Sequence, residues 1–287
     1  MPQIMRKIEL IILDYLGTLS ILGTFSLHLY KIKKLSFRYF IHLAYNGSDY
    51  HGWQVQDNAP TVQESLNKAL STLLSAELNV VGCGRTDTGV HASDFYAHFD
   101  LEKELSVEKR ETLIFKLNRF LPTSIVIFAL LPVKTVANTR FDAISRTYKY
   151  HVNRRKDPFF DDYSYFVYGD LDIDLMNQAA NEMMKYTDFT SFSKLHTQTK
   201  TNNCKITEAK WEEEAHKLVF TIKADRFLRN MVRSIVGTLL DVGRHKISID
   251  EFKTIIENKD RCEAGYSVPA KALFLDKVEY PEDIWIG

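Results

Sequence analysis

Residues 84–92 read Gly-Arg-Thr-Asp-Thr-Gly-Val-His-Ala and separate two strand-like runs, residues 78–83 and 95–101. Glycines on both sides of the central Asp87 let the backbone adopt positive φ or approach a ligand closely, which a residue with a Cβ does only at a cost. Asp87 stands between them, beside a guanidinium and a hydroxyl. A short Thr-Asp-Thr-Gly is also typical of a hairpin turn in which the Asp bonds its own backbone. The stretch is longer than such a turn requires, so we predict that it carries the chemistry.

The periodicities on either side of this stretch repeat along the chain. The first half reads strand, helix, strand, strand, helix, strand, with Thr61 and Glu64 at the spacing of a capping box that begins the first helix. The second half repeats this order and adds one helix. The elements expected in chain order are residues 38–45, a helix from 61, 78–83, 95–101, a helix around 113–121, and 124–131, then 146–152, 172–186, 204–211, 217–223, 227–242, 247–258 and 273–278.

Two βαββαβ units in succession predict an α+β fold made of two ferredoxin-like halves. We place the first half at residues 37–142 and the second at residues 143–287. Helices on one face of each antiparallel sheet would leave the other face free as a floor for a polymeric ligand.

Residues 1–36 differ in kind from the rest of the chain. Residues 10–30 are rich in apolar side chains and flanked by basic ones, but Asp14, His28, two glycines and several hydroxyl residues interrupt them. An Asp near the centre of a membrane helix costs about 2.5–3.5 kcal/mol, and no signal-peptide cleavage pattern follows. We therefore expect an N-terminal extension outside the catalytic fold, with no membrane partner.

The charge of the chain is balanced overall but uneven locally. Its 37 basic and 37 acidic residues give a net charge of zero, so the composition as a whole does not indicate a polyanionic partner. Residues 143–156 and 189–207, however, contain no acidic residue. Such runs are typical of a groove that follows phosphates, although a solvated loop face is the alternative. The candidate RNA contacts in the first run are Arg146, Arg154, Arg155 and Lys156.

The cysteines and the missing motifs limit the classes of chemistry. Cys83, Cys204 and Cys262 are widely spaced and form no Cys-x-x-Cys pair, which argues against a disulfide framework and a zinc site and favours a reducing cytoplasm. The chain also lacks a dinucleotide-binding fingerprint and a phosphate-binding loop of the nucleotide-hydrolase type. We therefore expect no cofactor and no metal.

Two further segments contain candidate site residues, including two more candidate RNA contacts, Arg226 and Arg229. If residues 227–242 form one helix, a rotation of about 100° per residue places Arg226, Arg229 and Arg233 on one stripe, opposite its apolar face. On the strand at 146–152, Tyr148 shares a face with Arg146. Periodicity leaves other interpretations open, because a tyrosine there could pack in a core and exposed arginines could line a solvated helix face.

Six groups of short motifs resemble those of the tRNA pseudouridine synthase A (TruA) family and occur in the same order as in that family. Besides the 84–92 stretch, they lie at residues 45–54, 61–64, 141–150, 188–192, 230–237 and 269–273. A single short motif is weak evidence, whereas several in register are strong. The resemblance covers residues 37–287 and excludes the N-terminal extension.

This resemblance implies an isomerase that converts uridine to pseudouridine in tRNA, at positions 38 to 40 of the anticodon arm, without a cofactor. It also implies a homodimer and two sheets joined across a central RNA-binding cleft. Asp87 matches the family's catalytic residue, and Tyr148 matches the tyrosine that stacks on the flipped uracil and helps remove its C5 proton. Arg233 matches the arginine that pairs with the catalytic Asp. Arg85 resembles the residue that enters the RNA helix and occupies the space that the base leaves.

The sequence departs from the family pattern at Thr88, where Ala is common, and at residues 93–96, where a Gly-Gln pair is common. Neither departure removes Asp87 or Arg85. Two other function classes are alternatives. An inactive RNA-binding module would be expected to have lost Asp87, Tyr148 or Arg233, and a metal-dependent hydrolase would need acidic or histidine partners near Asp87. Whether Asp87 attacks C1′ or C6 of the nucleotide, or acts as a base at C2′, is left open.

Overall fold

The structure, a computed structural model, describes residues 36–194 and 201–286. Within these residues nine strands form one sheet, in which seven lie side by side in the order β4-β1-β3-β9-β5-β8-β7, while β2 pairs with β3 and β6 with β5. The strands are β1 Phe37–Tyr45, β2 Val81–Gly82, β3 His91–Leu101, β4 Ile125–Val133, β5 Ser145–Asn153, β6 Tyr165–Phe166, β7 Ile206–Glu214, β8 Lys217–Ala224 and β9 Leu273–Glu279. The pairing is antiparallel except between β3 and β9 and between β5 and β6.

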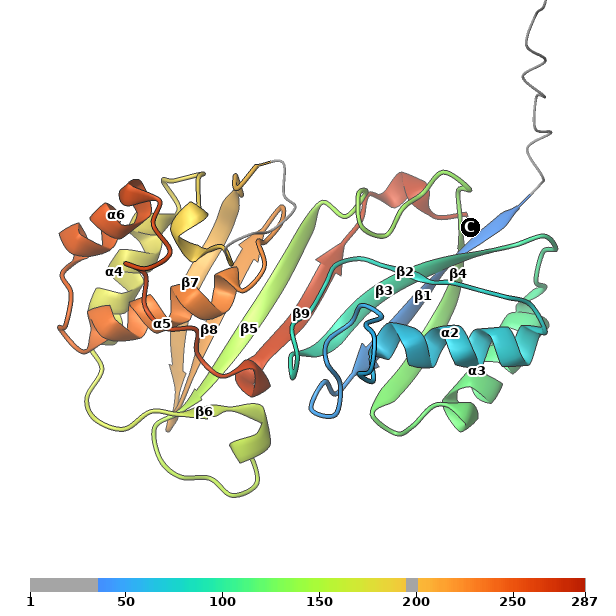
Figure 1. Cartoon of the computed structure of the whole chain (residues 1–287), viewed down its shortest axis with the longest axis horizontal. Coiled ribbons are helices and arrows are strands. Elements are labelled where there is room, and N and C mark those ends of the chain that lie inside the picture. The colour runs from blue at the N-terminus through green and yellow to red at the C-terminus, as the bar shows by residue number, and fades with distance from the viewer. Residues whose placement is uncertain (1–35, 195–200, 287) are drawn as a thin grey trace, which may run out of the picture. The chain divides into compact units, whose positions relative to one another are not determined.

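The helices gather over two parts of this sheet (Figure 1). They are α2 Val62–Leu74, α3 Val107–Phe120, α4 Ile173–Met183, α5 Met231–Gly243 and α6 Ile249–Asn258, with 3₁₀ turns η1 Asp161–Tyr163, η2 Thr190–Phe192, η3 Ala270–Ala272 and η4 Glu282–Ile284. The α2 and α3 helices lie with the first strands, and α4, α5 and α6 lie with β5, β7 and β8. A mostly antiparallel sheet with helices in this arrangement fits the predicted α+β class, and the order of elements is the predicted one apart from the short strand β6 and the 3₁₀ turns.

A parallel seam joins the two halves into one sheet, where we expected two. His91 and Ala92 of β3 pair with Phe274 and Leu275 of β9. On its other edge β9 pairs with β5, where Leu275 is the partner of Tyr148. Because β9 is paired on both sides, neither half has an open edge at the seam. The seam also places Tyr148 two strands away from the end of the stretch that carries Asp87.

The buried side chains form two clusters. In the first, Leu66 and Leu70 of α2 and Leu117 of α3 pack with Ile41 of β1. In the second, α4, α5 and α6 pack on β5, β7 and β8 through residues such as Ile235, Phe252 and Phe220. Burying each such side chain contributes about 1.5–3 kcal/mol. Tyr148 is half-buried and packs against both clusters, so it lies where the two cores meet.

The start of α5 differs from the prediction. We expected a helix from residue 227, but α5 begins at Met231, and Arg226 and Arg229 precede it. Asn230 has φ +67°, a left-handed conformation that a right-handed helix cannot contain. The side chain of Asn230 donates hydrogen bonds to Ser267 and Ser234, which stabilise this conformation. Arg226, Arg229 and Arg233 therefore do not share a helical stripe.

The predicted strand at 78–83 is also shorter than expected, since only Val81 and Gly82 pair with β3. The predicted helix start at Thr61 is confirmed, because its side chain accepts a hydrogen bond from the N–H group of Glu64. No helix in the part of the chain that the structure describes is both long and apolar enough to span a membrane. Our prediction for the N-terminal extension lies outside the described residues, apart from residue 36.

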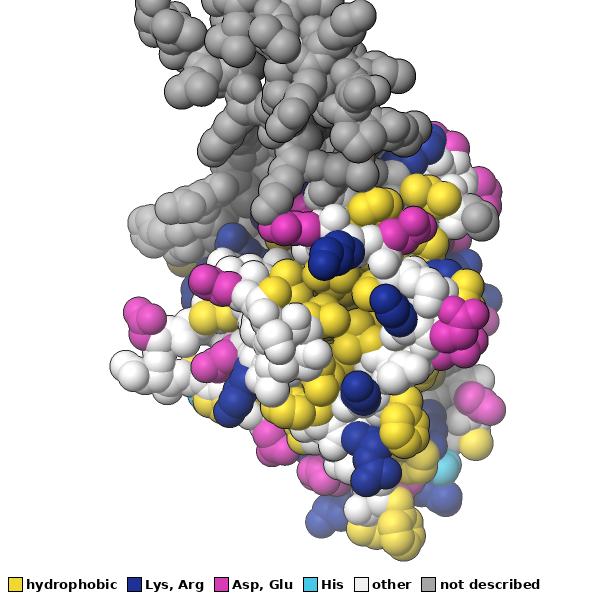
Figure 2. Space-filling model, turned by 90° about the vertical axis from the view of Figure 1, so that its right-hand side faces the viewer, with side chains coloured by type: hydrophobic (Ala, Val, Ile, Leu, Met, Phe, Trp, Pro, Cys, Tyr) yellow, Lys and Arg dark blue, Asp and Glu magenta, His cyan; other side chains and the backbone are white. Residues whose placement is uncertain are grey.

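Hydrophobic side chains are also exposed on the surface, several of them on α3 and β4. These are Val107, Phe115, Phe120, Val126 and Phe128. The face drawn in Figure 2 shows hydrophobic side chains in its middle with Lys and Arg side chains beside them. Such a mixture is ordinary on a protein surface and by itself identifies no binding site.

Candidate active site

The loop that carries Asp87 (residues 83–90, the Asp87 loop) is held against the segment after β1 by buried contacts. The Thr86 hydroxyl lies 2.8 Å from the hydroxyl of Tyr45, and the Gly89 N–H group donates to the carbonyl of Tyr50. A Cβ on Gly52, which has φ +88°, would lie 2.3 Å from the Thr86 carbonyl oxygen. The two sequence motifs at 45–54 and 84–92 are thus two sides of one packed contact.

The two glycines of the loop differ from each other. Gly89 has φ +78°, as the sequence predicted for a tight turn. Gly84 does not have a positive φ, and a Cβ added to it would meet nothing within 4 Å. The conformational need for glycine is therefore met at Gly89 and is not evident at Gly84.

His91 ties the end of the loop to both halves of the molecule. The Gly47 N–H group donates to its Nδ1 atom at 3.1 Å, so the proton of the ring is on Nε2, which donates to the carbonyl of Lys271 at 3.0 Å. Burial lowers the pKa of His91, which favours this neutral form. The histidine supports the loop and leaves both ring nitrogens occupied.

The carboxylate of Asp87 faces two arginines of the second half. Arg233, in the first turn of α5, places Nη1 3.7 Å from Oδ2, and Arg229 places Nε 3.4 Å from Oδ1. The Arg233 side chain is 20% exposed and donates from Nε to the carbonyl of Val268 at 2.7 Å. The Arg229 side chain is 60% exposed. The structure therefore brings together Asp87 and Arg233, as predicted, and adds Arg229 from the loop before the helix.

Tyr148 lies on the side of the sheet that the helices cover. It shares a strand face with the buried residues Tyr150 and Val152, and the ring of Phe227 meets its ring edge-on at 5.1 Å. Burial raises the pKa of Tyr148, and the charge of Asp87 adds to this effect. At neutral pH the side chain is thus a neutral phenol close to the carboxylate. Tyr148 therefore faces the helices and not the bare face of the sheet, the face on which we expected the ligand.

Arg146 is bonded inside the protein. Its guanidinium donates to four carbonyl oxygens, those of Ala143 and Asp225 from Nη1 and those of Cys83 and Arg140 from Nη2, at 2.6–3.2 Å. Cys83 is the first residue of the Asp87 loop, and Asp225 follows β8. Arg146 therefore holds three separate segments together beside the site, while its predicted contact with RNA stays a prediction.

The remaining predicted RNA contacts lie in two places. Arg85 is exposed next to Asp87, and Arg226 is half-buried just after Asp225. Arg154, Arg155 and Lys156 follow the far end of β5, about 20 Å along the strand from Tyr148. Arg155 and Lys156 are exposed, whereas Arg154 donates a hydrogen bond to the carbonyl of Gly169. The structure does not bring this second group to Asp87.

Arg140 is a basic residue near the site that the sequence reasoning missed. Partial burial lowers its pKa, and the nearby positive charges of Arg85, Arg146 and Arg226 lower it further. These four arginines thus form one cluster (the arginine cluster). Arg140 directly precedes the motif at 141–150. Because Asp142 follows it, Arg140 lies outside the acid-free run at residues 143–156 from which other candidates were chosen.

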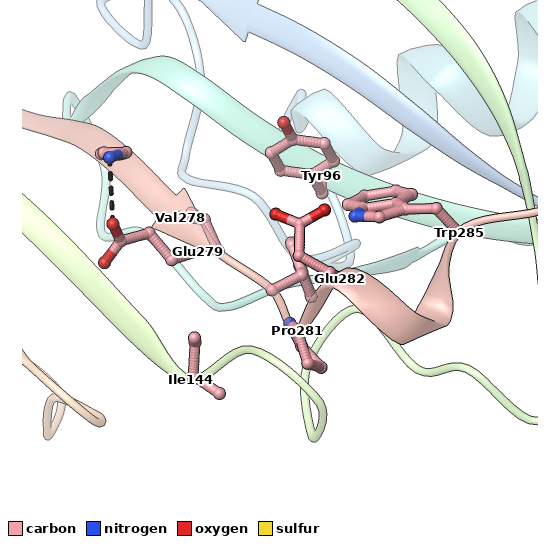
Figure 3. A pocket seen from close by; sticks show the side chains of 9 residues that line it. Tyr96, Ile144, Val278, Glu279, Pro281, Glu282 and Trp285 are labelled. Carbon is pink, nitrogen blue, oxygen red and sulfur yellow. Dashed lines mark ion pairs between the residues drawn. The ribbon is translucent and has the colours of Figure 1, made fainter. Parts of the chain in front are cut away.

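A pocket of about 540 Å³ lies elsewhere, at the end of β9 (Figure 3). Its lining includes Tyr96, Trp285 and the carboxylates of Glu279 and Glu282. Hydrogen bonds from Lys223, Ser145 and Lys277 lower the pKa of Glu279 to about 2, so it is negative at neutral pH. Two carboxylates repel phosphate, and none of the predicted site residues is among the described residues that line this pocket. Among residues 36–194 and 201–286, no group of three or more His, Cys, Asp or Glu side chains could hold a metal ion.

Comparison with known proteins agrees with these motifs. A family model described as tRNA pseudouridine synthase matches residues 179–281. The tRNA pseudouridine synthase A of Bacteroides thetaiotaomicron is 57% identical over 251 residues, which cover 86% of this chain and 92% of that protein. The chain belongs to the tRNA pseudouridine synthase family. The enzymes of the same name from Porphyromonas gingivalis and Clostridium acetobutylicum are 53% and 41% identical, and the matches cover 87% and 83% of this chain and 99% and 97% of theirs.

Family membership confirms the resemblance drawn from the motifs. It also confirms the predicted enzyme class, because pseudouridine synthases are isomerases. The residues that carry out the reaction are a separate question, which depends on the geometry around Asp87.

Proposed function

We propose that this enzyme isomerises uridine to pseudouridine in tRNA, in the anticodon stem-loop at positions 38 to 40, with Asp87 as the catalytic carboxylate. The observation that carries this proposal is the position of Asp87, whose carboxylate faces two arginines and lies near a half-buried tyrosine on the helix-covered side of the sheet. The family names of its relatives support the substrate class.

The reaction breaks the N1 to C1′ bond of uridine, turns the uracil and forms a bond from C5 to C1′. The C5 proton is lost and N1 gains a proton, so no electrons are exchanged with a partner. A base in a stem or stacked loop must first leave its stack, which costs a few kcal/mol that contacts with the protein recover. Asp87 then acts as nucleophile or base, and Arg233 keeps its carboxylate aimed.

Tyr148 is proposed to stack on the flipped uracil. Its raised pKa keeps the phenol protonated at neutral pH, which supports stacking more directly than removal of the C5 proton by a phenolate. Arg85, exposed beside Asp87, is proposed to enter the RNA and fill the space that the base leaves.

We also propose that residues 37–142 and 143–287 are two ferredoxin-like halves with an RNA-binding cleft between their helices. The strand order β9-β5-β8-β7, with β5 and β8 in the middle, supports this for the second half. Membership of the family supports a homodimer in the cytoplasm, and light scattering of the purified protein tests the dimer.

The test of the function is tritium release from tRNA that contains 5-tritiated uridine, followed by mapping of pseudouridine along the product. The wild-type protein should release tritium and modify positions 38 to 40. Asp87→Asn keeps the size of the side chain but not its charge, so release should fall by roughly three to six orders of magnitude. Affinity for tRNA and the melting temperature should change little.

Near-normal release by the Asn variant would refute the role of Asp87. Loss of release together with loss of folding would identify Asp87 as a structural turn residue. Modification at other positions would leave the reaction intact and refute the proposed target.

A further inference from the structure

The turn at residues 138–142 presents two side chains at the surface beside the Asp87 loop. Phe141 is 76% exposed, and the guanidinium carbon of Arg140 lies 5.6 Å from the centre of its ring. A single exposed phenylalanine needs no explanation. Phe141 is distinguished by how firmly its turn is held and by what surrounds that turn.

Hydrogen bonds within the turn fix the backbone from which both side chains project. The Asn138 side-chain oxygen accepts from the N–H groups of Arg140 and Phe141 at 2.9 and 3.2 Å. The Asp142 carboxylate accepts from the Asn138 N–H group at 2.7 Å. Since the backbone needs no further ordering, little conformational entropy would be lost when a ligand binds here.

The base of the turn is anchored in the core through Thr139, which is completely buried. Its hydroxyl donates to the carbonyl of Val81 in β2 at 2.8 Å, and its carbonyl accepts from the hydroxyl of Tyr280 at 2.6 Å. Its N–H group donates to Nδ1 of His98 in β3 at 3.3 Å. The turn thus belongs to the rigid frame of the first half.

The arginine cluster surrounds this turn with positive charge. Arg146 donates to the carbonyls of Arg140, Cys83 and Asp225, so it joins the turn to the Asp87 loop and to the segment after β8. Arg85 is two residues from Cys83, and Arg226 is next to Asp225. The acidic groups close by are already engaged, because Asp142 accepts from Asn138 and Asp225 accepts from the backbone of Lys205 and Arg226.

We propose that Phe141 and Arg140 form a nucleotide-stacking subsite, in which an unpaired base of the RNA loop stacks on the exposed ring of Phe141 and its phosphate lies between Arg140 and Arg85. An aromatic ring beside converging arginines matches the chemistry of single-stranded nucleic acid, in which every base has a flat face and every linkage a negative charge. The inference rests on the proposed function, since it assigns a further contact to the same tRNA.

A second pair of the same type offers an internal control. On α3, Phe115 is 63% exposed and the guanidinium carbon of Arg119 lies 5.7 Å from the centre of its ring. The Phe115 pair belongs to α3. The Phe141 pair belongs to the turn that Arg146 bonds to the Asp87 loop. Removal of each ring therefore separates stacking beside the site from an unspecific contribution of exposed phenylalanine.

The experiment measures the affinity of an unmodified anticodon stem-loop RNA for variants made in the Asp87→Asn protein, which prevents turnover. Phe141→Leu should weaken binding about tenfold, because stacking of one base on an aromatic side chain accounts for about a fivefold to 150-fold effect. Phe141→Trp should bind as well as the parent or more tightly. Phe115→Leu should leave the affinity unchanged, and Arg140→Gln should lower the slope of log affinity against log salt by about 0.7.

Equal affinities for Phe141→Leu and Phe115→Leu would overturn the subsite, as would a loss in Phe141→Trp as large as that in Phe141→Leu. A loss that is equally large for a stem duplex without unpaired nucleotides would also overturn it, because no loop base would then be involved. The proposed function is tested separately by tritium release from the wild-type protein. An active enzyme whose RNA affinity ignores Phe141 refutes only the subsite.

Discussion

The Asp87 loop and the segment that carries Arg229 and Arg233 meet at one carboxylate, yet they are held by different means. The loop is fixed by buried side-chain and backbone contacts with residues 45–53 and by His91. The arginines are fixed by their side chains. Arg233 donates a hydrogen bond to the carbonyl of Val268. Among the described residues, the guanidinium of Arg229 bonds only to Asp87. The difference indicates that the position of the carboxylate depends on packing, whereas its alignment depends on charge.

The largest effect is expected at Arg233, the more buried of the two arginines. Arg233→Gln removes a charge that orients Asp87, and loss of one such preorganised group typically costs 10²–10³-fold in rate. Single-turnover tritium release measures this loss. Arg244→Gln is the matched control, since Arg244 at the end of α5 is similarly buried and pairs with Asp241 at 3.9 Å. If both variants lose the same rate, the role of Arg233 is structural.

A smaller effect, on stability as well as rate, is expected at Gly47. A Cβ there would lie 2.0 Å from the carbonyl oxygen of Val90, so the Asp87 loop must shift to accommodate alanine. Such overpacking costs about 1–3 kcal/mol, which urea denaturation of Gly47→Ala should detect. Gly84→Ala should change neither stability nor tritium release, because a Cβ on Gly84 meets nothing within 4 Å. Equal stability of the two variants would show that the loop is not held by packing.

The smallest effect is expected at Arg229, which is 60% exposed. Water and salt screen its attraction to Asp87, so Arg229→Gln should lower the single-turnover rate less than tenfold. The comparison with Arg233→Gln in the same assay decides whether charge at Asp87 acts through one arginine or both. A loss as large as that of Arg233→Gln would make the two arginines equivalent.

The order of elements could be predicted because each strand or helix has its own apolar period, which is a local property of the chain. The joining of all strands into a single sheet could not be predicted, because β3 and β9 pair through only two residue pairs, whose members lie more than 180 residues apart in the chain. The predicted start of α5 was wrong for a similar reason. Asn230 breaks the helix with support from Ser267, which is distant in sequence, while the apolar period continues through residue 227 without interruption.

The candidate site divides in the same way. Asp87, Tyr148 and Arg233 could be proposed from motifs, because the reaction requires particular side chains at particular points of the chain. The bonding of Arg146 to four carbonyls and the gathering of Arg140 with Arg85 and Arg226 could not be proposed, because carbonyl groups carry no signature in the sequence. The sequence contains the same arginine whether its side chain contacts a phosphate or the backbone of three segments of the protein.

The sequence by itself determined the family and the α+β class, and it supplied the candidate groups for the chemistry, because these follow from residue types and local periods. The tertiary structure decided on which side of the sheet Tyr148 lies, which arginines reach Asp87, and that a rigid turn presents Phe141 beside the arginine cluster. These features arise where segments distant in sequence exchange hydrogen bonds, as at His91, Arg146 and Asn230. Their geometry depends on the partners that each segment meets in the folded chain.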